Sequence, residues 1–264
     1  MSKSPELRAA LIQYDIAHSA PHVNRQTIER LLAQLPTDTD LVVLPEMFTT
    51  GFGPHAVRDA EAMGGPTVEW MKAMSRSHGI FLMGSLPVRE GASIYNRLIG
   101  VSPEGQLHYI DKRHLFSYMG EDKAFAAGQM RGVWHWKGWS IMPAVCYDLR
   151  FPVWLRNDLQ YDLLIVVANW PVARIEAWKT LLKARAIENQ AYVVGVNRIG
   201  RDANEVEYGG YSSLIRYDGA VMLQAGEVET ILHCRIDHHA LYKFRAQFPF
   251  LDDRDAFTIQ LKDA

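Results

Sequence analysis

The chain has 264 residues, a length that one large α/β domain commonly reaches. Hydrophobic residues make up 48% of the sequence and charged residues 22%, which supplies a sizeable core and argues against a disordered chain. The formal net charge of −2 comes from interspersed acidic and basic residues, so we predict no nucleic-acid surface and expect a small-molecule partner.

Strand and helix patterns alternate along the first part of the chain. Apolar runs of strand length alternate with segments whose apolar residues recur at helical spacing. Pro66 is placed to open one of the helices, and Gly79 stands just beyond its end. The elements predicted here are strands at 7–14, 41–45 and 80–85 and helices at 21–35 and 66–78.

The second part of the chain continues the alternation without a linker. Val101-Ser-Pro-Glu-Gly105 predicts a hairpin turn, and Tyr217-Asp-Gly219 predicts the turn of a late antiparallel meander. An apolar strand ends at Cys146, and a short helix is predicted from about Pro152. Strands separated by helices favour an α/β sheet with outer helices, in one domain over residues 1–264. The remaining predicted elements are a strand at 163–168, a helix at 173–190 and a strand at 191–197.

The chain contains two cysteines, which does not suggest a disulfide scaffold and predicts a cytoplasmic location. Cys234 lies in an alternating strand pattern over residues 230–237, where a structural thiol is expected. The apolar stretch near the N-terminus contains Gln13 and Asp15 and is too short and too polar for a signal or membrane segment. No membrane partner is expected.

Three residues suited to catalysis stand where predicted strands end. A glutamate ends Asp40-Leu-Val-Val-Leu-Pro-Glu46, a lysine follows Tyr109-Ile-Asp111, and a cysteine ends Ile141-Met-Pro-Ala-Val-Cys146. Strand ends in α/β sheets face the ligand crevice, so a base, an oxyanion-binding cation and a nucleophile can meet there. Taken singly, each has a simpler interpretation, a buried structural thiol for the cysteine and a surface ion pair for the glutamate and lysine.

The order of these motifs resembles the nitrilase or carbon–nitrogen hydrolase superfamily, whose catalytic set is Glu-Lys-Cys in that chain order. The motifs are Leu-Pro-Glu46, Asp-Lys112-Arg-His-Leu-Phe116 and Cys146-Tyr-Asp-Leu-Arg-Phe-Pro152, and the resemblance covers nearly the whole chain. It implies the four-layer α-β-β-α sandwich of that superfamily, which hydrophobic periodicity alone does not predict.

The resemblance also implies a division of labour among the site residues. Glu46 is expected to act as the base and Cys146 as the nucleophile that forms a thioester. Lys112 and the backbone N–H of Tyr147 are expected to hold the oxyanion.

Amidases of the superfamily carry a second glutamate between the lysine and the cysteine, which positions substrate and touches the lysine. Glu121 is expected in that place, with Asp122 as the competing residue. The histidines show no metal-ligand spacing, so neither a metal nor another cofactor is expected.

Several residues near the three strand ends are candidates for substrate binding. Arg150 and Arg174 can each bind an anionic group bidentately, although a structural ion pair is the alternative for Arg150. Phe116 and Trp170 are candidate pocket walls, although aromatic residues near strand ends are more often part of the core. Asn169 belongs to the Asn169-Trp-Pro171 motif that the resemblance includes.

The motifs are most similar to those of the bacterial omega-amidase branch. This implies a thiol amidohydrolase that cleaves the terminal amide of 2-oxoglutaramate or 2-oxosuccinamate. A nitrilase, an aliphatic amidase or an N-carbamoyl amidohydrolase would use the same triad, and a redox-sensing or binding protein that uses Cys146 without turnover remains a distant alternative. The apolar helix at 173–190 and the aromatic segment Leu241–Phe250 predict a homodimer.

Overall fold

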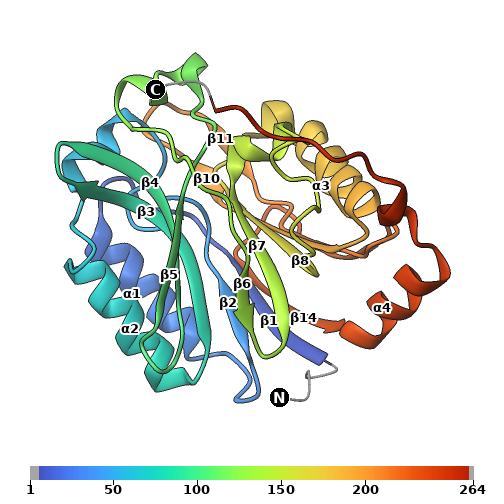
Figure 1. The fold of residues 1–264 in the computed structure, drawn as a ribbon. Helices are drawn as coiled ribbons and strands as arrows, with labels where there is room; N and C mark the ends of the chain where they lie inside the picture. Colours follow the sequence, from blue (N-terminus) through green and yellow to red (C-terminus); the bar gives the residue numbers. More distant parts are fainter. Residues whose placement is uncertain (1–5, 262–264) are drawn as a thin grey trace.

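The computed structural model describes residues 6–261, and within them the chain forms two six-stranded sheets packed face to face (Figure 1). The first sheet has the order β14 (Thr230–Asp237), β1 (Glu6–Gln13), β2 (Leu41–Val43), β3 (Phe81–Glu90), β4 (Ser93–Val101) and β5 (Leu107–Asp111). The second has the order β13 (Val221–Gln224), β12 (Ser213–Ile215), β9 (Tyr192–Asn197), β8 (Leu163–Ala168), β7 (Trp139–Val145) and β6 (Trp134–Trp136). A small hairpin of β10 (Ile199–Arg201) and β11 (Glu207–Gly209) stands apart from both sheets.

Helices cover the outer faces of the two sheets and complete the expected four-layer sandwich (Figure 1). The helices α1 (Pro21–Leu32) and α2 (Pro66–His78) pack on the first sheet, and α3 (Ile175–Asn189) packs on the second. The last helix, α4 (His238–Gln247), follows β14. The short 3₁₀ helices are η1 (Pro54–Asp59), η2 (Ser117–Met119), η3 (Glu121–Lys123), η4 (Cys146–Arg150), η5 (Val172–Arg174) and η6 (Phe250–Asp253). No helix among residues 6–261 is long and apolar enough to cross a membrane.

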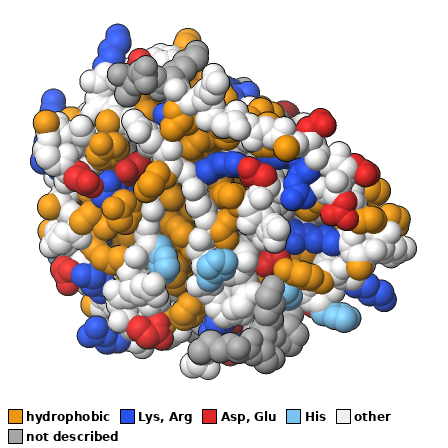
Figure 2. Space-filling model, viewed as in Figure 1, with side chains coloured by type: hydrophobic (Ala, Val, Ile, Leu, Met, Phe, Trp, Pro, Cys, Tyr) orange, Lys and Arg blue, Asp and Glu red, His pale blue; other side chains and the backbone are white. Residues whose placement is uncertain are grey.

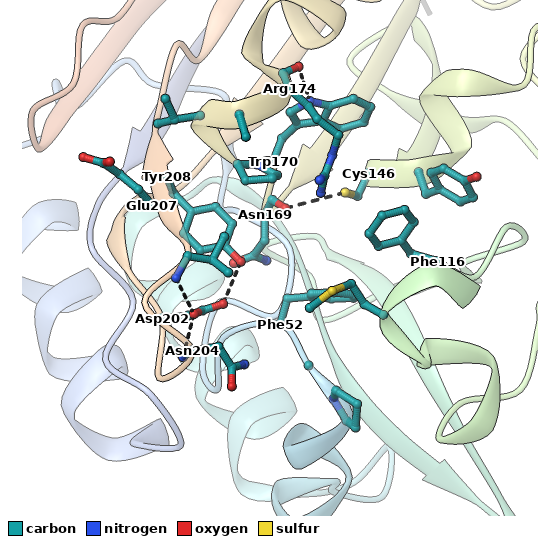
Figure 3. A pocket seen from close by; sticks show the side chains of 18 of the residues that line it. Phe52, Phe116, Cys146, Asn169, Trp170, Arg174, Asp202, Asn204, Glu207 and Tyr208 are labelled. Atoms are coloured by element: carbon teal, nitrogen blue, oxygen red, sulfur yellow. Dashed lines mark hydrogen bonds between the residues drawn. The ribbon is translucent and has the colours of Figure 1, made fainter.

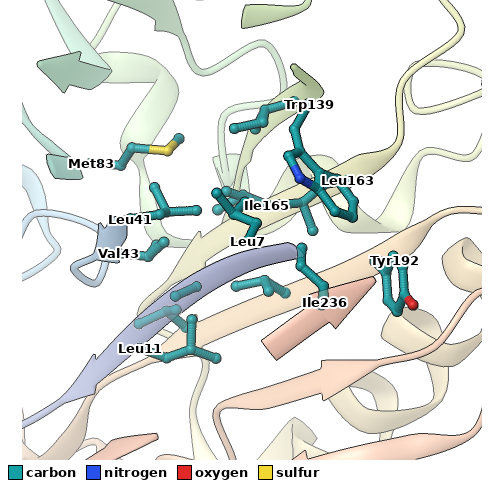
Figure 4. Packing of buried hydrophobic residues seen from close by; sticks show 14 of the residues in the cluster. Leu7, Leu11, Leu41, Val43, Met83, Trp139, Leu163, Ile165, Tyr192 and Ile236 are labelled. Atoms are coloured by element: carbon teal, nitrogen blue, oxygen red, sulfur yellow. The ribbon is translucent and has the colours of Figure 1, made fainter. Parts of the chain in front are cut away.

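The central strands of the sandwich are buried on both faces, because each sheet lies between its partner sheet and a helix layer. In β1, Leu7 and Leu11 point into the core between the sheets (Figure 4). Ala10 and Ile12 pack beneath α1 and α2. The partners of Leu7 and Leu11 across the sandwich include Ile165 of β8. This double burial explains why the strands read as near-continuous apolar runs.

Aromatic side chains fill the space between the edge strands β5 and β6. The ring centroids of Phe81 lie 5.3 Å from Trp136 and 6.3 Å from Trp134, and His108 lies 5.7 Å from Trp134. Figure 2 looks onto this edge, where hydrophobic side chains lie with histidines among them. The aromatic packing therefore closes the sandwich at its edge strands.

The direction of the strands brings distant parts of the sequence together. In the first sheet, β1, β2 and β3 are parallel, and two antiparallel steps give β5 the direction of β3. In the second sheet, β7, β8 and β9 are parallel. The C-terminal ends of these strands meet across the sandwich, where Asn169 after β8 donates from its backbone N–H to Glu46 after β2. Residues that follow β2, β5, β7 and β8 are thereby collected at one place.

Most predicted elements are present, but the helix expected from about Pro152 was wrong. Residues 152–155 form turns, and the only helical segment near them is the 3₁₀ helix η4, which ends at Arg150. Contacts with the end of α3 hold the following chain instead, with Arg156 donating to the backbone oxygen of Glu188 and the backbone N–H of Asn157 donating to Asn189 Oδ1 at 2.9 Å. These tertiary hydrogen bonds replace the hydrogen-bond ladder that a helix would need.

Candidate active site

A cavity of about 510 Å³ lies where the strand ends of the two sheets meet. The β10–β11 hairpin forms the wall opposite Cys146 and Phe116, as Figure 3 shows for Asp202 and Tyr208. Glu46 and Glu121 are not among the lining residues, but both contact Lys112, which lines the cavity. The predicted site residues that line the cavity are Lys112, Phe116, Cys146, Tyr147, Arg150, Asn169, Trp170 and Arg174.

The nucleophile candidate Cys146 has a backbone conformation that residues other than glycine rarely adopt. It directly follows β7 and opens η4, and its φ is 45°. Met47, directly after Glu46, has a φ of 48°. Such conformations cost roughly 1–3 kcal/mol and cluster at functional sites. The thiol of Cys146 lies at the cavity wall, with its Sγ 4.0 Å from the backbone oxygen of Asn169 (Figure 3).

Lys112 binds two carboxylates at once. Its Nζ is 2.9 Å from Glu46 Oε1 and 2.9 Å from Glu121 Oε2, and it also contacts Glu121 Oε1 at 3.0 Å. All three side chains are buried, whereas Asp122 is exposed. Because a buried charge needs a partner, the lysine and the two glutamates stabilise one another as a unit. The structure therefore brings Glu121, and not Asp122, to Lys112.

The Asn96 side chain and two backbone N–H groups complete the hydrogen bonding of the two carboxylates. Asn96 Nδ2 donates to Glu46 Oε1 at 2.8 Å and to Glu121 Oε1 at 3.3 Å. The backbone N–H of Phe116 donates to Glu121 Oε2 at 2.6 Å, and that of Asn169 donates to Glu46 Oε2 at 2.8 Å. The positions of both glutamates are thus fixed from four different segments of the chain.

Burial and charge set the protonation states in this unit. Burial raises the pKa of the Cys146 thiol well above its usual value, the neighbouring Glu46 raises it further, and Lys112 opposes both. Burial acts to lower the pKa of Lys112, but Glu121 and Glu46 outweigh it, so the net shift is upward. The resting site therefore holds an ammonium on Lys112 and a neutral thiol on Cys146, which needs a base before it can attack.

The two arginines of the cavity stack on aromatic rings. The guanidinium of Arg150 lies 5.0 Å from the ring centroid of Trp170, and that of Arg174 lies 5.1 Å from the ring centroid of Phe116. Trp170 Nε1 donates to the backbone oxygen of Arg174 at 2.8 Å, which fixes the ring. Tyr147 packs against Phe116 with centroids 5.0 Å apart. The candidate wall residues therefore form one aromatic and cationic surface.

Neither arginine of the cavity has a carboxylate partner among residues 6–261. Two acidic residues that could have paired with Arg150, Asp148 and Glu188, have other partners. Asp148 contacts His114 Nδ1 at 2.8 Å, and Glu188 pairs with Arg185 at 2.9 Å. The structural ion pair considered for Arg150 is therefore wrong.

Sequence analysis missed several residues of the site. Asn96 was hidden in a strand, where an inward-facing polar side chain in an apolar run was the available signal. The β10–β11 hairpin was also missed, although Asp202 and Asn204 are typical turn residues. Asp202 accepts hydrogen bonds from the backbone N–H of Asn204 at 2.8 Å and from the Tyr208 hydroxyl at 2.9 Å, which fixes the shape of the hairpin.

The described part of the chain contains no group of three or more His, Cys, Asp or Glu residues arranged to hold a metal ion. The site brings together the Cys146 thiol, the Lys112 ammonium and two guanidinium groups at the cavity, with the two carboxylates buried directly against Lys112. This set can attack a carbonyl carbon, accept and return a proton, and stabilise an oxyanion.

The fold and this site together define a class of thiol-dependent hydrolases, the nitrilase superfamily. The chain belongs to the carbon–nitrogen hydrolase family, whose sequence model matches residues 8–246.

Named relatives and a solved structure resemble the chain over nearly its whole length. It is 40% identical to omega-amidase YafV of Escherichia coli (strain K12), over 97% of this chain and 99% of that protein. It is 33% identical to 2-oxoglutaramate amidase of Bacillus subtilis (strain 168), over 92% and 95% of the two chains. The crystal structure of XC1258 from Xanthomonas campestris, a CN-hydrolase superfamily protein with an arsenic adduct in its active site, has a TM-score of 0.95 and 43% identity, and the match covers 97% of this chain and 99% of that one.

Proposed function

We propose that this protein is an omega-amidase, which hydrolyses the terminal amide of 2-oxoglutaramate or 2-oxosuccinamate to the acid and ammonia. One observation carries the proposal: a single cavity holds the Cys146 thiol and two arginines, Arg150 and Arg174, that lack acidic partners among residues 6–261. The named activities of the omega-amidase and 2-oxoglutaramate amidase relatives support the same substrate class.

In the proposed first step, Cys146 Sγ attacks the amide carbonyl carbon while Glu46 takes the thiol proton. Glu46 is a close enough neighbour to raise the pKa of the Cys146 thiol, so it is suitably placed for this transfer. Negative charge then develops on the carbonyl oxygen, where Lys112 and the backbone N–H of Tyr147 are the proposed donors. Loss of one such donor typically costs about 10²–10³ in rate.

In the proposed second and third steps, the tetrahedral adduct breaks its C–N bond, and Glu46 returns the proton to the leaving nitrogen. Ammonia departs and a thioester remains on Cys146. Water then attacks the thioester carbon, Glu46 accepts a proton from the water, and the C–S bond breaks. The sulfur regains a proton and the carboxylic acid is released.

Substrate choice is proposed to depend on the arginines. A small amide offers few atoms to grip, so a carboxylate away from the reacting carbonyl provides binding energy that orients the amide over Cys146. Arg150 and Arg174 lie against aromatic rings in the cavity wall, where a guanidinium keeps its donors free for a carboxylate. An amide that also carries a carboxylate therefore suits the cavity better than a neutral amide does.

Ammonia release from a substrate panel tests this proposal. The panel contains 2-oxoglutaramate, 2-oxosuccinamate, glutamine, neutral amides of equal length, nitriles and N-carbamoyl compounds. We expect the two 2-oxo acid amides to have by far the highest kcat/KM. Preference for a nitrile, a neutral amide or an N-carbamoyl compound would contradict the omega-amidase proposal and favour that alternative within the family.

Methionine substitutions of Arg150 and Arg174 test which of the two arginines binds the substrate carboxylate. Replacing the arginine that binds the carboxylate should lower kcat/KM for acidic substrates. The loss should correspond to about 1.5–3 kcal/mol of activation free energy, the range for a hydrogen bond to a charged group. Neutral amides should be affected much less. Arg201, an exposed arginine of β10, is the matched control, and its methionine variant should leave both substrate classes unchanged. The carboxylate contact is wrong if neither Arg150→Met nor Arg174→Met separates the two classes.

We further propose that residues 1–264 act as one hydrolase domain in a cytoplasmic homodimer. Exposed apolar side chains support the dimer, because Ile187 of α3 and Phe250 of η6 are 55% and 60% exposed. The two free cysteines, Cys146 and Cys234, support a reducing compartment.

A further inference from the structure

The buried cluster of Glu46, Lys112 and Glu121 contains two carboxylates and one ammonium. Glu46 receives donors on both oxygens, from Lys112 and Asn96 on Oε1 and from the backbone of Asn169 on Oε2. Glu121 also receives donors on both oxygens, from Lys112 on each and from Phe116 on Oε2. A protonated carboxyl would need an acceptor for its own proton, and these contacts are donors.

A chain of hydrogen bonds fixes the direction of the Asn96 amide. The backbone N–H of Met47 donates to Ser85 Oγ at 2.9 Å, so the Ser85 hydroxyl is free to donate to Asn96 Oδ1 at 2.8 Å. The amide group of Asn96 therefore turns its Nδ2 toward Glu46 and Glu121. Burial raises the pKa of Glu121 above its ordinary value, and the neighbouring Glu46 adds to this rise, whereas Lys112 and the hydrogen bond from Phe116 oppose it. With donors from Asn96, Lys112 and Phe116, the ionised form is the one the cluster holds at neutral pH.

The cluster consequently carries a net charge of −1 at the reacting end of the cavity. The Cys146 thiol and the Tyr208 side chain line the cavity and remain neutral, because burial raises the pKa of both. Arg150 and Arg174 line the same cavity but stack on the rings of the wall and contact neither glutamate. The remaining charged groups of the wall, Asp202 and Glu207 on the hairpin, are acidic.

This charge distinguishes a substrate from its product. The amide group is neutral, whereas the product brings a third carboxylate to a cluster with one ammonium. We propose that the cluster, through its second carboxylate Glu121, makes the site bind the amide and reject the ionised acid, so that the acid binds only together with a proton. This inference rests on the proposed amidase function and adds a basis for product release.

The proposal predicts a specific pH dependence. If the bound acid carries a proton that the free acid lacks, its Kd rises tenfold for each pH unit, while the Kd of the amide stays constant. In a Glu121→Gln variant, the bound acid restores the wild-type count of two carboxylates around Lys112. The acid then binds without a proton, and its pH dependence disappears.

Calorimetric binding to a Cys146→Ala protein, which cannot turn substrate over, tests this. We compare the Kd of 2-oxoglutaramate with that of 2-oxoglutarate from pH 6 to pH 8. Both ligands carry the same distal carboxylate, so the ratio of acid Kd to amide Kd reports only the effect of the group at the reacting end. The ratio should rise about 100-fold across this range, as expected for one linked proton. With Glu121→Gln added, the ratio should no longer depend on pH. Adding Asp122→Asn, the exposed neighbour, should leave the slope unchanged.

Glu46→Gln in the Cys146→Ala background provides a second variant, because it removes the other carboxylate and should flatten the ratio in the same way. A ratio independent of pH in Cys146→Ala, or a slope retained in folded Glu121→Gln and Glu46→Gln variants, would overturn the inference. If neither 2-oxoglutaramate nor 2-oxoglutarate binds, the proposed substrate is wrong. The same Kd ratio is then measured with the amide that the ammonia-release panel identifies and with the acid formed from that amide.

Discussion

Replacing Lys112 by methionine removes the ammonium that two buried carboxylates share, and it should destabilise the fold as well as slow turnover. The Nζ of Lys112 lies 2.9 Å from each of Glu46 and Glu121. One such contact corresponds to roughly 6 kcal/mol of Coulomb energy at an effective dielectric of 20, most of which offsets desolvation of the charges. Loss of one partner from a buried pair costs about 3–5 kcal/mol, and we expect that loss at pH 8.

The loss should shrink as the pH falls. Burial already raises the pKa of the Glu121 carboxyl, and without Lys112, which opposes that rise, the folded-state pKa of such a buried carboxyl lies further above its unfolded value. Such groups are protonated in the folded chain, so they lower its stability progressively as the pH rises above the unfolded pKa. The difference from wild type should change by about 1.4 kcal/mol per pH unit for each proton taken up.

Urea unfolding at pH 6, 7 and 8, followed by circular dichroism at one protein concentration, measures this difference. Lys123→Met, at an exposed lysine of η3, is the matched control and should change the free energy of unfolding by less than about 0.5 kcal/mol. Lys112→Met combined with Glu121→Gln should regain part of the loss. A loss below about 1 kcal/mol at pH 8, or one that does not vary with pH, would refute the reasoning.

Three further predictions concern the cysteines and the assembly. A stoichiometric thiol reagent should label Cys146 first and abolish activity, because Cys146 lines the cavity beside Glu46, whereas Cys234 is buried in the core; mass spectrometry showing Cys234 modified as activity falls would contradict the assignment. The free energy of unfolding of Cys146→Gly should exceed that of Cys146→Ala by about 1 kcal/mol, since only glycine adopts a positive φ freely. Equal free energies of unfolding would show that the backbone at this position is unstrained. Light scattering at micromolar concentration should give about twice the 30.0 kDa chain mass, and a value near one chain mass would exclude the homodimer.

The sequence by itself determined the parts of this protein that depend on local pattern. Apolar runs located the buried strands, and Pro66 and Gly79 marked the two ends of α2, where Gly79 has a φ of 66°. The same runs showed that Glu46 and Cys146 each follow a strand, and parallel strands bring such ends together.

Only the tertiary structure decided which side chains meet. Glu121 and Asp122 are adjacent in the sequence, and burial of the first against Lys112 distinguishes them. The helix expected from Pro152 is absent because contacts with the end of α3 hold that segment. Asn96 is 50 residues from Glu46 and was found only through its hydrogen bond. Local pattern fixes strands and turns, whereas charge pairing and hydrogen bonding between distant segments depend on how the two sheets pack, which no short stretch of sequence encodes.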